Sequence, residues 1–262
     1  MNFQDTPRVA YKLNPLKEVV IQYTFTGSLS SFVPNFSSRM VDLHQLLILQ
    51  LPYFNSDTNT GVSFDLAGLQ MGAPLATQNL SLVNYHFASE SMRLTINERF
   101  LAFTVTEYES WEKFYGLVST VFKFLAGEAS VFSFRFARVG LRYRDIIERQ
   151  VLGLGDCKWG ELIVPDLLPG DLLSNPDLLG NHSTLVFRLN EGQLIANFAA
   201  VTNATSNEQA FMIDGDFFIE AESLDYAKAD STVQGFNKSA RNFFRWCITD
   251  KLYDALQPSP KS

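Results

Sequence analysis

The chain has 262 residues, of which 46% are hydrophobic and 19% charged, and this composition excludes an intrinsically disordered protein. Its net charge of −7 disfavours general adhesion to nucleic acid, because such binding depends on many lysine and arginine contacts to phosphate. No stretch approaches the roughly 20 apolar residues that span a bilayer, and the N-terminus lacks an apolar run behind a basic start. We therefore expect a cytoplasmic protein with no membrane contact.

The first half of the chain, residues 1–150, predicts strands and helices that alternate. Runs of β-branched and aromatic residues favour strands, whereas apolar residues at spacings of three and four favour amphipathic helices. Ser110 is placed to cap the second helix and Gly127 to end it. In chain order we expect a strand at 18–25, a helix over 37–51, three or four strands between 62 and 106, a helix at 110–126, and a long strand over roughly 131–147.

Residues 151–181 differ in character, with three prolines, five glycines and repeated Leu-Leu pairs. This composition predicts a connector with short helical turns. The second half, residues 182–262, predicts strands at 183–189, 193–201 and 210–221, followed by a closing helix over about 231–256. Thr249 is placed to cap a fresh turn, which would divide that helix in two.

Together these patterns predict an α+β protein with mostly antiparallel sheets, helices packed on one face, and two fused halves. The two cysteines, Cys157 and Cys247, have no disulfide or metal-ligand spacing, and we expect both to be buried thiols. The sequence contains no P-loop, nucleophile-elbow or zinc-protease motif. It therefore predicts no cofactor and no catalytic residue, and it does not favour an enzyme.

An arginine-rich stretch at 134–150 is the first candidate site. Alternate residues of a strand face opposite sides, and here the core positions change from even to odd near residue 137, which predicts a bulge at Gly140. Arg138, Arg142 and Arg144 then emerge on one face over roughly 20 Å, at ~3.3 Å per residue. With Tyr143, they form a candidate site for an anion or a partner. The alternative is a solvent-exposed face that pairs with acidic residues on adjacent strands.

An acidic strand, residues 211–223, is the second candidate site. Asp214 and Asp216 share one of its faces with Glu220 and Glu222, and apolar residues occupy the other face. Two carboxylates that flank a glycine are candidate ligands for Mg²⁺ or Mn²⁺, since hard cations take oxygen ligands. Salt bridges to the arginine strand are an equally natural use of these residues.

Four short patterns occur along the chain: Pro15-Leu16-Lys17-Glu18-Val19-Val20, Trp111-Glu112-Lys113-Phe114, Arg138-Val139-Gly140-Leu141-Arg142-Tyr143 and Asp214-Gly215-Asp216. In this order they resemble a sporadically distributed, functionally uncharacterised bacterial protein family. That pattern would place an amide residue after the Arg-Tyr pair, where this chain has Arg144-Asp145, and a histidine where Phe236-Asn237 stands. The resemblance implies an intracellular α+β protein with an accessory role, such as antiviral defence or a toxin–antitoxin system.

The leading interpretation is a non-enzymatic protein-binding or regulatory module of such a bacterial accessory system. The alternative is nucleic-acid or nucleotide binding through Arg138, Arg142 and Arg144, with metal-dependent phosphodiester hydrolysis at Asp214 and Asp216 as a variant of it. A protein partner is therefore expected first and a nucleic acid second. The oligomeric state stays open.

Overall fold

The computed structural model describes residues 3–63, 78–127, 130–170, 173, 180–202 and 208–260. The helices are α1 (Phe36–Leu47), α3 (Trp111–Ala126), α4 (Tyr226–Cys247) and α5 (Asp250–Ala255). The strands are β1 (Val9–Tyr11), β2 (Leu16–Phe25), β3 (Tyr53–Ser63), β4 (Gln78–Ala88), β5 (Met92–Ile96), β6 (Phe100–Val105), β7 (Arg135–Glu148), β8 (Asn181–Arg188), β9 (Gln193–Thr202), β10 (Gln209–Asp225) and β11 (Pro258–Pro260). The expected α+β class is confirmed.

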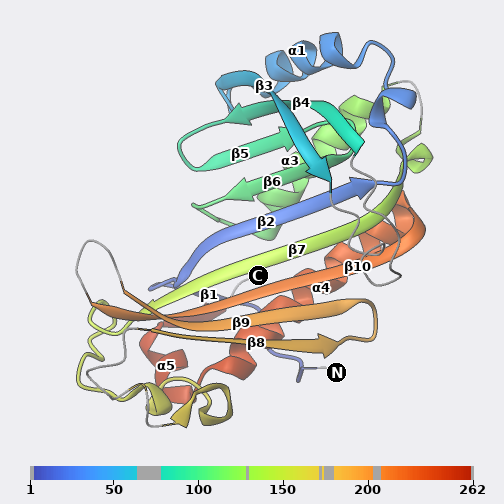
Figure 1. Ribbon diagram of the computed structural model, residues 1–262. Coiled ribbons are helices and arrows are strands. Elements are labelled where there is room, and N and C mark those ends of the chain that lie inside the picture. The colour runs from blue at the N-terminus through green and yellow to red at the C-terminus, as the bar shows by residue number, and fades with distance from the viewer. Residues whose placement is uncertain are drawn as a thin grey trace.

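Nine strands form one antiparallel sheet in the order β3-β4-β5-β6-β2-β7-β10-β9-β8. The helices lie against one face of it, and β2 and β7 run through the middle (Figure 1). On one side of the centre, the strands β4, β5 and β6 form a meander that leads into α3. On the other side, β8, β9 and β10 form a matching meander that leads into α4. The two wings of the sheet are thus built alike, and a single sheet contains both halves of the chain.

The core between the sheet and the helices is built from the inward-facing alternate residues of the strands and the apolar stripes of the helices. On β2 the odd positions Val19, Ile21, Tyr23 and Phe25 are buried. The buried residues of α3 recur at spacings of three and four, as an amphipathic helix requires. As predicted, the Ser110 hydroxyl caps α3 by accepting a hydrogen bond from the backbone N–H of Lys113 at 3.2 Å.

The irregularity in β7 lies at residue 137 and not at Gly140. The pairing of β7 with both β2 and β10 shifts register between Phe136 and Arg138. Core positions therefore change parity there, as the sequence predicted, while Gly140 stays in regular register opposite Gln22 and Phe218. The predicted bulge at Gly140 is wrong, because the extra residue is accommodated three positions earlier.

Two further expectations are corrected in part. The strand expected from residue 62 begins at Tyr53, and residues 64–66 of that expected strand lie outside the described residues. Cys247 is a buried free thiol, whereas Cys157 is only partly buried.

Thr249 does separate α4 from α5, as predicted, and its hydroxyl accepts a hydrogen bond from the backbone N–H of Leu252. None of the helices in the described part of the chain is long and apolar enough to cross a membrane.

Candidate functional site

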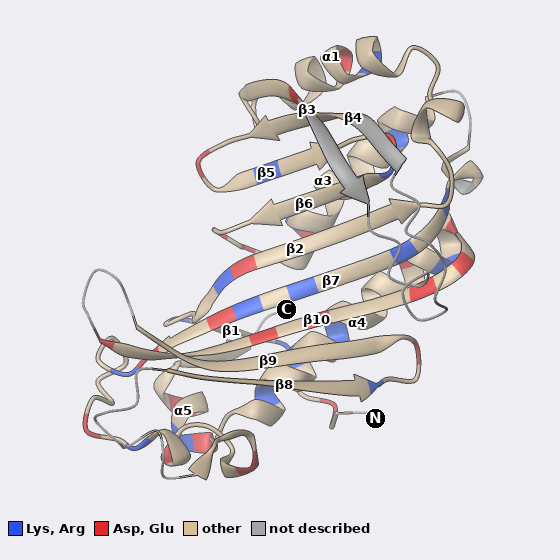
Figure 2. Ribbon diagram, viewed as in Figure 1, with Lys and Arg blue, Asp and Glu red and all other residues tan. Residues whose placement is uncertain are grey.

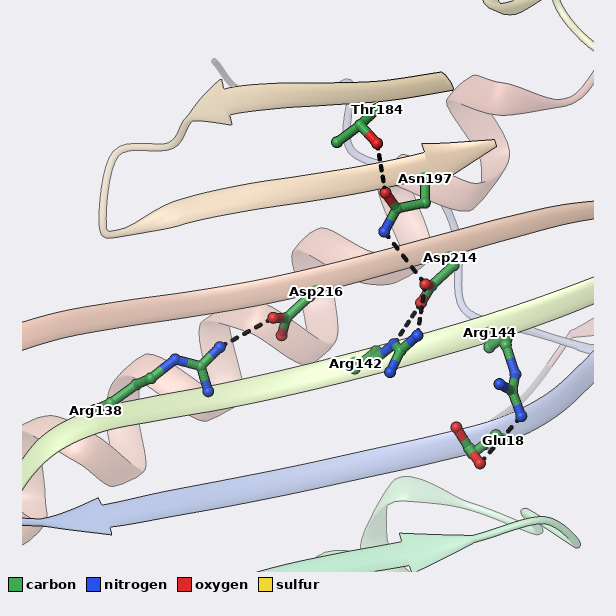
Figure 3. A network of polar contacts seen from close by, with 8 residues as sticks. All are labelled: Glu18, Arg138, Arg142, Arg144, Thr184, Asn197, Asp214 and Asp216. Carbon is green, nitrogen blue, oxygen red and sulfur yellow. Dashed lines mark hydrogen bonds and ion pairs between the residues drawn. The ribbon is translucent and has the colours of Figure 1, made fainter. Parts of the chain in front are cut away.

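The polar residues of β7 divide between the two faces of the sheet. Lysine and arginine positions alternate with aspartate and glutamate positions along β2, β7 and β10 in the middle of the sheet (Figure 2). The side chains of Arg138, Arg142 and Arg144 project from the face that the helices leave uncovered (Figure 3). Tyr143 and Asp145 alternate with them and project toward the helices. The predicted binding set therefore does not form one site, since Tyr143 lies on the opposite side from the arginines.

Arg142 and Asp214 form the centre of a network on the uncovered face (Figure 3). The guanidinium donates Nε to Oδ1 at 2.6 Å and Nη2 to Oδ2 at 2.7 Å, a bidentate geometry. Asn197 donates to Asp214 at 3.4 Å and accepts from the Thr184 hydroxyl at 2.8 Å. The Asp214 side chain is 3% exposed. Its hydrogen bonds are the main cause that raises the pKa of Arg142 above the ordinary value.

Arg138 crosses the same face toward the acidic strand. Its Nη2 donates to Asp216 Oδ2 at 2.9 Å, its Nε lies 3.7 Å from Glu220 Oε1, and its guanidinium stacks 4.7 Å from the centre of the Phe218 ring. The side chain passes directly over Gly140, where a Cβ atom would lie 2.8 Å from Nη1. A side chain at position 140 would therefore have to displace the end of the Arg138 side chain. Burial raises the pKa of Asp216, although Arg138 acts in the opposite direction.

Arg144 completes the set by donating to Glu18 Oε2 on β2 at 3.1 Å. Each of the three arginines thus meets a carboxylate on an adjacent strand, which is the alternative that the sequence left open. Three guanidinium groups face four carboxylates here: Glu18, Asp214, Asp216 and Glu220. A phosphate could bind these arginines only by displacing a carboxylate that already occupies the same donors.

Asp214 and Asp216 likewise face arginines and not one another. In the part of the chain that the structure describes, no group of three carboxylate, histidine or cysteine side chains is arranged to hold a metal ion. A divalent ion at these two residues would have to compete with Arg142 and Arg138 for the same oxygens. The metal site therefore stays a prediction from sequence without further geometric support.

On the helix side of β7 a cavity of about 330 Å³ opens between β1, β7, α4 and the start of α3. Its walls are rich in aromatic and polar side chains: Arg8, Tyr11, Tyr108, Glu109, Trp111, Tyr143, Asp145, Asn237, Arg241 and Phe244, with smaller residues between them. The Tyr143 hydroxyl donates to Asn237 Oδ1 at 2.9 Å, which fixes both groups in the wall. A cavity of this size and composition is typical of a site for a small molecule.

Asp145 is the unusual residue in this cavity. It is 8% exposed, and none of the described residues forms an ion pair or a hydrogen bond with its carboxyl group. Burial is the main cause that raises the pKa of Asp145 to about 8, and the negative charge of Asp214 on the neighbouring strand adds to the effect. A buried carboxyl group without a partner is costly, and where it lines a cavity it marks a candidate functional site.

The N-terminal segment closes one side of the cavity. Arg8 forms an ion pair with Glu112 at the start of α3, at 2.6 Å. The backbone and side chain of Thr6 donate to Asn242 Oδ1 on α4 at 3.1 and 2.9 Å. The small sheet of β1 and β11 continues this cover, since Tyr11 packs edge-on against Phe244. Segments far apart in sequence therefore build the cavity together.

A third feature is a set of exposed apolar residues on α1 and just after it. Met40, Leu43 and Leu47 are buried in the core, whereas Val41 and Leu46 on the same helix are each 50% exposed. Ile48 and Leu49, in the turn that follows α1, are 43% and 91% exposed. Tyr53, at the start of the edge strand β3, is 65% exposed and follows closely in the chain. We call these five exposed residues the α1 patch.

Sequence reasoning missed Asp145 as a site residue, although its signal was present. Position 145 falls on the core parity of β7, and an acidic residue at a core position is rare without a partner. Asp145 and Asn237 both line the cavity. No protein-family model matches the chain, and no curated protein matches it.

Proposed function

We propose that this protein is a non-enzymatic binding module that engages a protein partner through the α1 patch. The observation that carries the proposal is the exposure of Leu49, 91%, in the turn that directly follows α1, a helix whose inner side is buried in the core. Large exposed apolar clusters mark surfaces where another protein docks.

The composition of the segment supports a protein partner. Between residues 40 and 56 the only acidic or basic residue is Asp42, apart from His44. Depletion of charge and enrichment in large apolar and aromatic residues distinguish the centre of a protein interface from the remaining surface. The arginine network, by contrast, offers a poor surface for phosphate, because its guanidinium groups are already paired with carboxylates. Nucleic-acid binding thus receives less support than protein binding.

The proposal is tested by affinity capture with the full chain expressed in its native host. The test variant combines Leu46→Glu with Leu49→Glu, which places two charges in the α1 patch. The matched control is Val186→Glu on β8, since Val186 is 63% exposed at the opposite edge of the sheet. We expect one protein to be recovered in near-stoichiometric amount with the wild type and the control, and at least tenfold less of it with the test variant.

Binding measurements with the purified partner and the purified chains are the second test. The captured partner should bind the wild-type chain directly and bind the test variant at least tenfold more weakly, while thermal unfolding of all three chains stays similar. Recovery that is equal with the test variant would overturn the proposal, as would failure to capture any partner with the wild type. If light scattering shows a homodimer that the test variant separates, the occupant is a second copy and the proposal of a foreign partner is wrong.

The expectation that this partner belongs to a defence or toxin–antitoxin system rests on the family resemblance alone and stays a prediction.

A further inference from the structure

The cavity behind β7 lacks a positive charge where its buried carboxyl group needs one. Arg8 and Arg241 also line the cavity, but Arg8 pairs with Glu112 and Arg241 lies 3.7 Å from Asp5. Burial and the charge of Asp214 raise the pKa of Asp145, and neither arginine offsets this rise, although the Nε of Arg241 is buried without a hydrogen-bond partner. The cavity therefore offers an unpaired acceptor, and the missing partner of a buried carboxylate is a cation.

The walls around this acceptor have the chemistry that favours an organic cation. Five aromatic rings line the same space, and they are Tyr11, Tyr108, Trp111, Tyr143 and Phe244. The faces of aromatic rings attract cations, and cages of such rings are the usual means by which proteins bind alkylated ammonium groups. Trp111 and Tyr115 stack at 4.9 Å and Tyr108 meets Tyr143 edge-on at 6.1 Å, so the walls are held in place by packing.

We propose that this cavity binds a small organic ammonium ion, with the ammonium group against the Asp145 carboxylate and the carbon body against the surrounding aromatic rings. The inference is independent of the protein interface at α1, because the cavity lies between β1, β7, α3 and α4. The volume of about 330 Å³ sets the size class, which is that of a small amine and not of a peptide chain or a nucleotide.

The ionisation of Asp145 is linked to the binding of such an ion. A carboxyl group with a pKa of about 8 is mostly protonated at pH 7, and a cation binds to its ionised form. Binding at pH 7 should therefore release up to about one proton per ligand. The titratable and charged groups that face Asp145 or share its cavity come from several elements: Arg8 before β1, Tyr11 from β1, Tyr143 from β7, Asp214 from β10, Arg241 and Cys247 from α4, and Tyr108 and Glu109 before α3.

None of these neighbours is expected to mask the titration of Asp145. Burial raises the pKa values of Tyr11, Tyr108, Tyr143 and Cys247 above their ordinary values, so these groups stay neutral while Asp145 ionises. Glu109 is already in an ion pair with Lys113. A change in affinity across pH 6 to 9 should then report on Asp145.

Calorimetry with three matched pairs of probes tests the proposal. The pairs are choline with 3,3-dimethyl-1-butanol, 2-phenylethylamine with 2-phenylethanol, and n-butylamine with 1-butanol, which differ within each pair in positive charge and not in shape. At pH 8.5 we expect at least one ammonium ion to bind ten times more tightly than its neutral counterpart, or about 1.4 kcal/mol. Asp145→Asn should abolish that difference, and Asp156→Asn, at an exposed position, should leave it unchanged.

Choline provides the sharpest readout because its own charge does not titrate. Its affinity for the wild type should rise between pH 6 and 8, by up to tenfold per unit, and level off above pH 8, whereas Asp145→Asn should show a flat profile. The proposal is overturned if no ammonium ion of the three binds more tightly than its alcohol. It is equally overturned if the preference for charge survives in Asp145→Asn, since the cation would then bind elsewhere.

Discussion

Arg144 and Asp145 are neighbours in the chain, yet they lie on opposite sides of one sheet and in opposite electrostatic situations. Arg144 joins a face where each of the three arginines meets a carboxylate from an adjacent strand. Asp145 points into a cavity where no described residue pairs with it. Paired charges of the first kind hold strands together, whereas an unpaired buried charge of the second kind reduces stability and is retained where it serves a ligand.

This contrast predicts a different response of each face when one charge is removed. On the uncovered face, loss of an arginine should leave its carboxylate partner without a counter-charge and so destabilise the protein. On the helix side of the sheet, loss of the Asp145 carboxylate should remove an unpaired buried charge and so stabilise the protein. The following variants measure both effects.

The largest effect is expected for Asp145→Asn at alkaline pH. The folded-state pKa of Asp145, about 8, lies above the unfolded value of 3.8, so the folded protein binds the proton more tightly. The contribution of Asp145 to the free energy of unfolding is therefore at its highest below about pH 4. It falls as the pH rises to 8, by up to ~1.4 kcal/mol per pH unit. Asp145→Asn lacks this loss, so its stability relative to the wild type should increase steadily from pH 5 to pH 8 in urea titrations.

The exposed control Asp156→Asn should follow the wild type at every pH. If Asp145→Asn also runs parallel to the wild type between pH 5 and pH 8, the carboxyl group has a counter-charge in solution and the contrast between the two faces fails.

A smaller effect of opposite sign is expected for Arg142→Met. The variant leaves Asp214, 3% exposed, as a buried carboxylate without its bidentate partner. Because Arg142 itself is 42% exposed, the cost should fall below that of a fully buried pair, at about 2–3 kcal/mol in chemical denaturation. Adding Asp214→Leu should recover most of this loss, since the uncompensated charge is then removed as well.

Arg144→Met is the matched control on the same strand. Arg144 makes one hydrogen bond at 3.1 Å to Glu18, and the two side chains are 37% and 19% exposed. Loss of that pair should cost no more than about 1 kcal/mol. Equal costs for Arg142→Met and Arg144→Met would show that burial of the carboxylate does not decide the strength of these pairs.

The fold class and the division of β7 into two faces could be predicted, because alternation and helical spacing are local properties of the sequence. The capping residues Ser110 and Thr249 could be predicted for the same reason. The pairing of Arg142 with Asp214 could only be offered as one of two alternatives. It depends on which strand lies beside β7, and those residues are 72 positions apart in the chain.

The cavity could not be predicted at all, because β1, the start of α3, β7 and α4 meet there only in the folded protein. Tyr143 was grouped with the arginines because it is close to them in sequence. As an odd-numbered residue of β7, however, it lies on the same face of the sheet as Asp145. An acidic residue on the core parity of a strand was the one available clue. Its meaning depended on whether a cation from another element would lie beside it, which sequence alone does not give.

The smallest effect concerns Gly140, for which the sequence and the structure give different reasons. If glycine were needed for a bulge, Gly140→Ala would strain the backbone whatever lies nearby. In the structure the strand is regular there, and the added Cβ would meet only the end of the Arg138 side chain at 2.8 Å. Gly140→Ala should therefore displace Arg138 from Asp216 and Phe218, at a net cost of about 0–1 kcal/mol after the gain from replacing glycine.

A double-mutant comparison separates the two reasons. In an Arg138→Met background the obstructing guanidinium is gone, so Gly140→Ala should become stabilising by about 0.5–1 kcal/mol, as a glycine-to-alanine change in regular structure normally is. Gly116→Ala on the exposed side of α3, where a Cβ meets nothing within 4 Å, should be stabilising by a similar amount in either background. A cost of Gly140→Ala that persists without Arg138 would instead place the strain in the backbone of β7 itself.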